Sequence, residues 1–476
     1  MNRFSLFVSV LVATAAASTA TAQTPDSMPR TIPSGASSVF LGGVPAGTKT
    51  DAALTISILD AMNRALEHNL GVVMANEQIG HADGTRWGEL SQLLPNVNAH
   101  ISQSRLQNNL EAFGFTSFGS AFGDIPTIVG PFNVFDARIS VSQTLIDLNA
   151  INSTRSESHN LQAARLTYQG ARDLVVWVSG NLYLQALAAA ARVDAARAQQ
   201  QTAQVLYTQA LDLKQGGIIA GIDVLRAEVE LNVQTNRATT AVNNAEKAKL
   251  QLARVMGLPL GQNYTLDPAL PELPTPDLTI EQAVERAFET RADYQASLER
   301  VRAAEAARQA IIGEALPSLH VNADIGKIGL SASDAQRTVN IVGTVQIPIF
   351  QGNRTHGRVL EADADLRSRR AEAEDLKGAI YYEVRTAFLD LQATTEQLQV
   401  ATNARDLANQ QLTQSRDRFA AGVASNIEII QAQEAVAIAN EQYISALYGN
   451  DLAKGALIRG VGTAESTLRQ YLGGAR

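Results

Sequence analysis

Two carboxylate side chains stand at equivalent places in two similar stretches of the sequence. Asp223 lies in GIIAGIDVLRAEVE, which begins at Gly217, and Glu428 lies in GVASNIEIIQAQEA, which begins at Gly422. In each stretch we expect the glycine, whose backbone accepts left-handed dihedral angles, to end one helix, with the acid in the first turn of the next helix. The positive end of the helix dipole stabilises a carboxylate there, which by itself accounts for both acids. Carboxylates gathered at a constriction would in addition attract cations.

The sequence offers no support for catalysis or for a metal site. It contains no H-E-x-x-H, no G-x-S-x-G and no glycine-rich phosphate loop ending in Lys-Ser/Thr. The chain has no cysteine, which excludes disulfides, zinc–thiolate sites and cysteine nucleophiles, and its six histidines are scattered. Its five methionines form no cluster of the kind expected along a path for soft metal ions. We therefore expect neither an enzyme nor a cofactor.

Composition and the N-terminus indicate an exported protein that does not bind nucleic acid. The 476 residues carry a net charge of −8, so there is no basic surface for DNA or RNA. Residues 1–22 have the pattern of a secretory signal peptide, with Arg3, an apolar stretch at Leu6–Val12 and A-T-A at the predicted cleavage site. The alternative, a membrane anchor, would need an apolar run of ~20 residues. No such run follows either, so a membrane role would have to use β-strands.

Roughly 200 residues of the sequence occur twice, which indicates a duplicated structural unit. AMNRALEHN at Ala61–Asn69 matches AVERAFETR at Ala283–Arg291, and in a second register Tyr183 matches Phe388. We expect one repeat at 54–260 and the other at 278–462, with a proline-rich linker at 261–277. An extended segment at 23–53 precedes the repeats and a tail at 463–476 follows them.

Long helices are predicted in the tracts without proline that make up most of each repeat. Small and apolar residues recur there at helical spacing, in a stripe narrow enough for close helix pairs. An unbroken helix from about Asn149 to Gln215 would be ~100 Å long. Turned back at Gly217, and again at Gly422 in the second repeat, such helices would form two long antiparallel hairpins. An ordinary helical bundle in solution is the alternative on pattern alone.

Four short segments before the hairpins alternate apolar and polar residues as strands do. They are LPNVNAHISQSR, DARISVSQTLID, LPSLHVNADIG and RTVNIVGTVQIPIF, at 94–105, 136–147, 316–326 and 337–350. Each has about the 10 residues of a tilted membrane strand. Four strands would leave unpaired edges, which lipid does not tolerate, so several chains would have to share one barrel.

The segment between the first two strands is rich in phenylalanine. It is interpreted either as an outer loop with aromatic residues near the membrane interface or as a hydrophobic cluster in a soluble loop. Its members are Phe113, Phe115, Phe118, Phe122, Phe132 and Phe135.

The ordered set of these segments, present in duplicate over residues 54–462, resembles the TolC-like outer-membrane efflux protein family. Each copy has a leader helix, a strand after L-P, a strand ending VSQTLID or VQIPIFQGN, a long helix, a glycine turn and a second long helix. The resemblance implies a mainly α fold with a small transmembrane β part. In it, each protomer of a homotrimer gives four strands to a shared 12-stranded β-barrel and its long hairpins to a periplasmic α-barrel.

The same resemblance implies the function and the partners. The protein would be the outer-membrane exit duct of a tripartite efflux or type I secretion system, a passive channel for small molecules or proteins. Cargo would come from an inner-membrane pump through a periplasmic adaptor, and outer-membrane lipid would surround the barrel. A secreted or periplasmic coiled-coil scaffold without a pore is the alternative, and it would need neither alternating strands nor barrel closure.

The resemblance also assigns the residues of the periplasmic mouth. Glu428 and, one turn later, Gln431 occupy the positions of the family's acidic entrance rings, so only the Glu428 ring is expected here. The tyrosine and arginine that tie the closed mouth in some members are replaced by Phe419 and Ala424, whereas Asp223 keeps the acid of the first turn. Whether this mouth rests closed is left open.

Two further expectations concern the surface of the turns. Arg226, one turn beyond Asp223, either pairs with an acid across the protomer interface or is solvated. The small residues of the turns either admit the backbone of a docking adaptor or merely shape tight turns. The residues assigned to docking are Gly217, Gly221, Gly422 and Ala424.

Overall fold

The structure is a computed structural model that describes residues 37–113, 127–268, 278–421, 423 and 426–467. From Ser38 onward the chain forms one compact unit. The predicted signal peptide lies outside the described residues. So do Gly422 and Ala424 of the second turn and, of the loop phenylalanines, Phe115, Phe118 and Phe122.

The predicted duplication is visible as two series of elements with matching lengths. Each repeat opens with a helix of 11 residues followed by one of 22. These are α2 (Ile58–His68) and α3 (Leu70–Ser91) in the first repeat, α6 (Ile280–Thr290) and α7 (Ala292–Gly313) in the second. Both short helices begin with a capping box, formed by Ser57 with Asp60 and by Thr279 with Gln282. The same local interactions thus start both copies.

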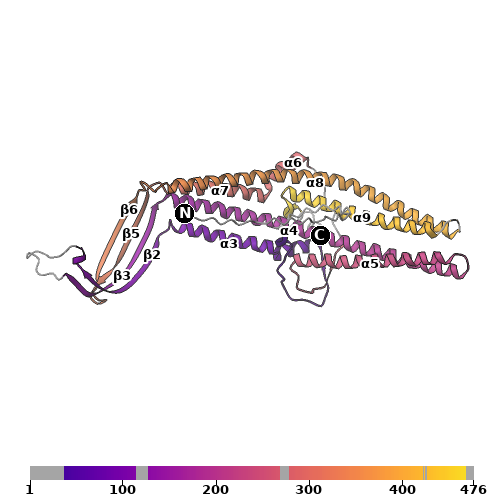
Figure 1. The fold of residues 1–476 in the computed structure, drawn as a ribbon, viewed down its shortest axis with the longest axis horizontal. Coiled ribbons are helices and arrows are strands. Elements are labelled where there is room, and N and C mark those ends of the chain that lie inside the picture. Colours follow the sequence, from indigo (N-terminus) through magenta and orange to yellow (C-terminus); the bar gives the residue numbers. More distant parts are fainter. Residues whose placement is uncertain (1–36, 114–126, 269–277, 422, 424–425, 468–476) are drawn as a thin grey trace, which may run out of the picture. The chain divides into compact units, whose positions relative to one another are not determined.

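The four predicted strands form one antiparallel sheet in the order β2-β3-β5-β6 (Figure 1). They are β2 (Asn96–Asn109), β3 (Ile128–Ile146), β5 (Ser318–Gly329) and β6 (Gln336–Gln346). β2 and β3 continue into the segment predicted as an outer loop, because pairing persists through Leu106 with Phe132 and Asn108 with Val129. Phe132 and Phe135 are therefore strand residues, not loop residues. β6 ends earlier than predicted, since Pro348 has no N–H to donate to a neighbouring strand.

Each half of the sheet continues into a long helical hairpin. The hairpin helices are α4 (Leu148–Gln215) with α5 (Gly221–Val255), and α8 (Arg354–Ala420) with α9 (Asn426–Gly460). α4 has 68 residues and is ~100 Å long, as the sequence predicted. The carboxylate of Asp147 starts it by accepting hydrogen bonds from the backbone N–H groups of Asn149 and Ala150, at 2.8 and 3.2 Å.

The helices pack side by side in one layer (Figure 1). Near the sheet, α3 packs on α4, α4 on α7 and α7 on α8. Toward the turns, α5 replaces α3 beside α4, and α9 replaces α7 between α4 and α8. One margin of the layer is therefore α3 followed by α5, and the other is α8.

Two apolar clusters hold the middle of the layer together, one in each repeat. The first packs α2 on α4 and α5 around Tyr183, and the second packs α6 on α8 and α9 around Ile380. The Tyr183 hydroxyl lies 3.0 Å from the Ile56 carbonyl oxygen and 2.8 Å from that of Asp267. It thereby ties α4 to a parallel pair of short strands, β1 (Leu54–Ile56) and β4 (Tyr264–Leu266).

A buried charged cluster joins the helices of the second repeat at the same level. The guanidinium of Arg291, only 6% exposed, lies 2.7 Å from Asp293 and 2.7 Å from Glu383. Arg459 on α9 contacts the other oxygen of Glu383 at 2.7 Å. The one buried charge of this cluster, Arg291, thus has two opposite partners that are themselves partly exposed, the condition under which a buried charge is tolerated.

Among the described helices, α4 contains an 18-residue window apolar enough to cross a membrane by length and composition. Of that window, 56% is buried against the rest of the structure. A buried core helix gives the same signal, so the window is weak support for a spanning helix.

Candidate functional site at the helical hairpin turns

The first turn is a glycine-dependent helix end. Gly217 has φ +70°, its N–H donates to the Lys214 carbonyl at 3.0 Å, and the N–H of Ile218 donates to the Leu213 carbonyl at 2.9 Å. This pair of bonds satisfies the last carbonyls of α4 and requires a left-handed residue at Gly217. The chain then reverses, and α5 begins at Gly221.

The acid of the first turn is paired within its own helix. Asp223 lies in the first turn of α5, and its Oδ1 accepts a hydrogen bond from Nη1 of Arg226 at 3.1 Å. The pairing of Arg226 with an acid of another protomer stays a prediction. Within the chain, its side chain is 45% exposed and binds the acid one turn earlier.

The acid of the second turn is paired across the hairpin. Glu428, in the first turn of α9, contacts Arg418 in the last turn of α8, with Oε1 and Nε 3.2 Å apart. The N–H of Val423 donates to the Arg418 carbonyl at 3.0 Å, which repeats the bond made by Ile218 in the first turn. Gln431 is exposed and brings no second charge.

In the two repeats, equivalent acids are thus paired with basic residues that stand at different positions of the repeat. In the register that pairs Tyr183 with Phe388, Arg418 corresponds to Leu213, and Gln431 corresponds to Arg226. Sequence reasoning missed Arg418 because it considered only Phe419 and Ala424 for the missing basic partner. Its signal was present: a basic residue in the last turn of a helix whose return partner begins with an acid.

Apolar side chains are exposed around both turns. Ile218 is 72% exposed and Val423 is 67% exposed. On the return helix α5, Leu225 and Val229 are one turn apart and 57% and 63% exposed. An apolar surface beside a turn of small residues is typical of a site where another protein binds.

Two ion pairs hold the hairpins of the two repeats next to each other. Arg192 on α4 binds Glu441 on α9 at 2.8 Å, and Arg237 on α5 binds Glu434 on α9 through both nitrogens at 2.8 and 2.9 Å. The hydrogen bonds from Arg237 lower the pKa of Glu434 despite partial burial. Both turns therefore lie at the same end of the layer.

The sheet at the opposite end of the helices has one polar and one apolar face. On the polar face, Arg138 binds Asp136 at 2.6 Å and Asp324 at 3.2 Å. The paired rows of the apolar face are largely exposed, with Ile101 at 75% and Ile341 at 72%. The predicted alternation of the strands is thus realised as two distinct surfaces: Val97, Ala99, Ile139, Val141, Ala323, Ile325, Val339 and Ile341 on one, and Asn98, His100, Ser140, Ser142, Asn322, Asp324 and Asn340 on the other.

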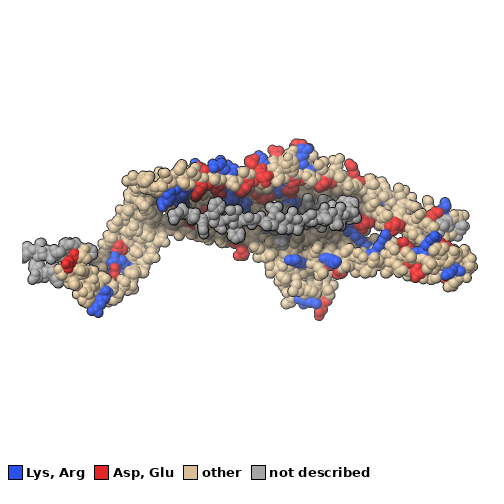
Figure 2. All heavy atoms as spheres, viewed as in Figure 1, with Lys and Arg blue, Asp and Glu red and all other residues tan. Residues whose placement is uncertain are grey.

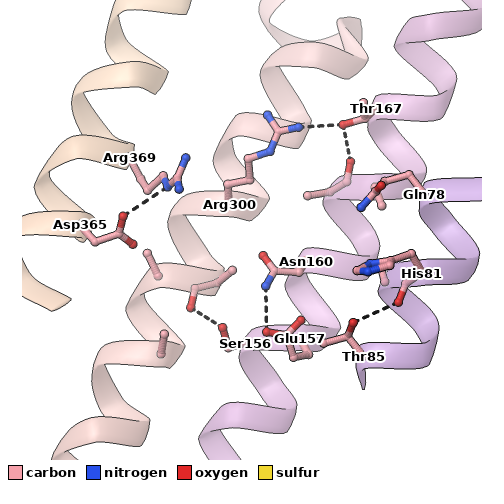
Figure 3. Close-up of a pocket in the computed structure, with 16 residues that line it drawn as sticks. Gln78, His81, Thr85, Ser156, Glu157, Asn160, Thr167, Arg300, Asp365 and Arg369 are labelled. Atoms are coloured by element: carbon pink, nitrogen blue, oxygen red, sulfur yellow. Dashed lines mark hydrogen bonds and ion pairs between the residues drawn. The ribbon is translucent and has the colours of Figure 1, made fainter. Parts of the chain in front are cut away.

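A polar pocket of about 600 Å³ opens between α3, α4, α7 and α8 (Figure 3). Its wall carries both signs of charge, including Glu157, Arg300 and Asp365, between small alanine side chains. The guanidinium of Arg300 donates to the Thr167 hydroxyl at 2.9 Å (Figure 3). Among the described residues, no group of three or more His, Asp or Glu side chains is arranged to hold a metal ion.

Comparisons with known proteins identify the architecture. A sequence model described as "Outer membrane efflux protein" matches residues 283–463, which include all but the first five residues of the second repeat. Outer membrane protein TolC of Escherichia coli is 21% identical over 333 residues, 66% of this chain and 67% of that protein. Pyoverdine export outer membrane protein OpmQ of Pseudomonas putida is 22% identical over 404 residues, 83% of each chain.

Solved structures agree with the fold. The Campylobacter jejuni CmeC outer membrane channel superposes with a TM-score of 0.75 at 18% identity, covering 91% of this chain and 94% of that one. The open state of the Neisseria gonorrhoeae MtrE outer membrane channel gives a TM-score of 0.70 at 14% identity, covering 88% and 94%. These relatives and neighbours are outer-membrane proteins, and the neighbours are channels. Residues 283–463 thus match the outer membrane efflux protein family, and the chain has the fold of the solved outer-membrane channels over about nine tenths of its length, with 91% covered by CmeC.

Proposed function

We propose that three copies of the chain form the exit duct of a tripartite efflux or type I secretion system. Each protomer gives its four strands to one 12-stranded barrel and its two hairpins to a hollow periplasmic cylinder. The duct is passive: it carries small molecules or proteins that an inner-membrane transporter delivers through a periplasmic adaptor. The repeats at 54–260 and 278–462 are the two structural units of each protomer.

The observation that carries the proposal is that the sheet and the helical layer both end in unpartnered margins. Within the described part of the chain, β2 and β6 each pair on one side only. Unpaired strand edges are not stable in lipid, so the sheet requires further strands. The helical layer is likewise open at two margins, formed by α3 and α5 on one side and by α8 on the other.

The α8 margin carries an apolar stripe that supports closure between copies. Tyr382, Leu389, Val400 and Leu407 follow one another at spacings of seven and eleven residues, which place them on one face of the helix. They are 71%, 63%, 66% and 64% exposed in the single chain. Packing of this stripe on the opposite margin of the next copy would remove it from water and close the layer into a ring.

The charges of the structure suit an aqueous passage. The polar face of the sheet, with Arg138 bound to two carboxylates, would line the barrel, and the apolar face would meet lipid. In the helical layer, blue and red atoms are interspersed over the visible face, whereas the sheet is mostly uncharged (Figure 2). Small-molecule export, named for the P. putida relative, is the first cargo class to test.

The test is extraction of the protein from isolated outer membranes, followed by electrophoresis with and without heating. The duct predicts that only detergent releases the protein, as a trimer that dissociates to monomers on heating. A periplasmic scaffold without a pore would be released with the soluble fraction and would not run as a heat-sensitive trimer. Truncation of the α8 stripe, by Leu389→Ala with Val400→Ala, is expected to lower the dissociation temperature, whereas Val205→Ala on α4 serves as an exposed apolar control.

A further inference from the structure

Two basic side chains are directly paired on the apolar face of the sheet. Lys327 on β5 is opposite Arg337 on β6, and both are exposed. Their row continues with Ala137 on β3 and Ile101 on β2. Within the part of the chain that the structure describes, neither Lys327 nor Arg337 takes part in an ion pair or a side-chain hydrogen bond.

This arrangement is unfavourable without an anion from outside the sheet. Like charges directly opposite on neighbouring antiparallel strands repel each other. Asp136, one row from the pair, and Asp324, three rows from it, lie on the other face and are bound by Arg138. The polar face is therefore internally neutralised, whereas the pair on the apolar face is not.

Lys327 and Arg337 lie at the height on the sheet where the apolar band of a membrane barrel would end. Leu319 begins the apolar face of β5 at the end next to the helices, and Lys327 lies eight residues further on, ~26 Å at 3.3 Å per residue. With the tilt of about 40° usual in such barrels, this is ~20 Å along the membrane normal, close to the height of an apolar band of ~25 Å. Phe135 occupies the next row outward, where aromatic residues mark an interface.

The end of the sheet that carries the pair is remote from the helices, since the four helices connected to its strands, α3, α4, α7 and α8, all join the sheet at its other end (Figure 1). If the helices are periplasmic, the pair lies at the level of the outer leaflet. Charged atoms of the sheet are gathered toward that end in the space-filling view (Figure 2). Arg105, two rows further outward on the same face of β2, is also exposed.

We propose that Lys327 and Arg337 bind a phosphate group of an outer-leaflet lipid. The two cations would share the phosphate oxygens, which converts their mutual repulsion into a joint attraction. Ile101 and Val339, beside them on the same face, would contact the acyl region below the head group. This inference rests on the proposed trimeric barrel, because it requires the apolar face to meet lipid.

The test compares lipid binding by detergent-extracted trimers using bis-phosphorylated lipid A as the probe. Lys327→Gln with Arg337→Gln is expected to weaken binding about tenfold or more, because it removes both cations that would share the phosphate oxygens. The matched control is Lys247→Gln with Arg416→Gln, which removes the same charge from α5 and α8 and leaves the affinity unchanged. Dephosphorylated lipid A is expected to bind the wild type as weakly as bis-phosphorylated lipid A binds the double variant.

A second measurement works even if the double variant assembles poorly. Addition of lipid A is expected to raise the heat-dissociation temperature of wild-type trimers, and dephosphorylated lipid A is expected not to. Equal effects of the two lipids, or wild-type affinity in the double variant, would overturn the lipid site. Wild-type protein that forms no trimers would instead refute the proposed duct, whereas conducting trimers that are indifferent to lipid A refute only this inference.

Discussion

Arg418 on α8 and Glu428 on α9 face each other across the second hairpin turn, with Nε and Oε1 3.2 Å apart. In the first turn the equivalent acid, Asp223, is bound by Arg226 of its own helix at 3.1 Å. Each acid that symmetry would bring to the periplasmic mouth therefore carries a basic partner within its own protomer. A ring formed by three copies would expose less net negative charge than the acids alone suggest.

We predict that Arg418→Gln makes the channel more cation-selective and that Glu428→Gln makes it less so. A unit charge in water interacts with an ion ~4 Å away by about 1 kcal/mol, so each substitution should change the cation-to-anion permeability ratio by up to about fivefold. The ratio is read from the reversal potential under a salt gradient. Lys247→Gln, on α5, removes a positive charge away from the turn and should leave the ratio unchanged. Identical ratios for all variants would show that Glu428 serves only the start of α9.

The buried cluster around Arg291 predicts a pH-dependent contribution of Asp293 to stability. Burial alone would raise the pKa of Asp293, but the hydrogen bonds and charge of Arg291 outweigh it and lower the pKa. A carboxyl group with a depressed pKa in the folded state stabilises above its unfolded pKa, ~3.9, and loses this contribution as the pH falls through the folded value. Asp293→Asn should therefore lower the unfolding temperature at pH 7, and the difference from wild type should vanish in strong acid.

Asp173 on α4 is the control, because the pKa of its carboxyl group is shifted in the opposite direction. Burial raises the pKa of its carboxyl group, although the backbone N–H of Glu465 donates to Oδ1 at 3.0 Å. Asp173→Asn keeps an acceptor for that N–H and removes a buried charge, so it should not lower the unfolding temperature at pH 7. If Asp173→Asn and Asp293→Asn destabilise equally at neutral pH, the assignment of opposite pKa shifts is wrong.

A glycine in the sheet gives a steric prediction. A Cβ at Gly326 would lie 2.4 Å from the Ala137 carbonyl oxygen and 2.5 Å from the Arg138 Cβ, so Gly326→Val must push β5 away from β3. Overpacking of this kind costs about 1–3 kcal/mol, and we expect a lower heat-dissociation temperature of the oligomer. Gly343→Val on β6 is the matched control, because a Cβ there meets nothing within 4 Å. Equal behaviour of the two variants would contradict the register of β3 with β5.

The absence of cysteine allows a direct test of adaptor docking at the turns. Single-cysteine variants at Ile218 and Val423 place the only thiol of the chain on side chains that are 72% and 67% exposed. A thiol-reactive photo-crosslinker at either position is expected to capture the periplasmic adaptor in cells. Leu260→Cys, at a position 84% exposed in the middle of the molecule, is the control and should capture much less. Strong capture at Leu260 alone would move docking away from the turns.

Local patterns predicted much of the fold. Helical spacing and the lack of proline placed α4 at about Asn149–Gln215, and it spans Leu148–Gln215. The turn at Gly217 followed from the need for a left-handed residue, and its φ is +70°. Period-two alternation located all four strands, because each strand has one apolar and one polar face. The ends of the strands were less predictable from the sequence, because β3 continues for as long as it finds hydrogen-bonding partners on β2.

Contacts between distant segments were beyond the sequence. The sequence places Arg418 in the last turn of one helix and Glu428 in the first turn of the next, but whether the two side chains meet depends on how α9 returns along α8. The like-charge pair of Lys327 and Arg337 depends on the register of β5 with β6, which a shift of one residue would abolish. Which face of the sheet each residue occupies could be predicted, but which residue it meets could not.

The central claim, a water-filled duct through three copies of the chain, is tested most directly by conductance across a planar lipid bilayer. We predict that the detergent-extracted trimer gives stepwise current increments and that the monomers released by heating give none. Trimers from the outer membrane that insert into the bilayer without any conductance would contradict the duct.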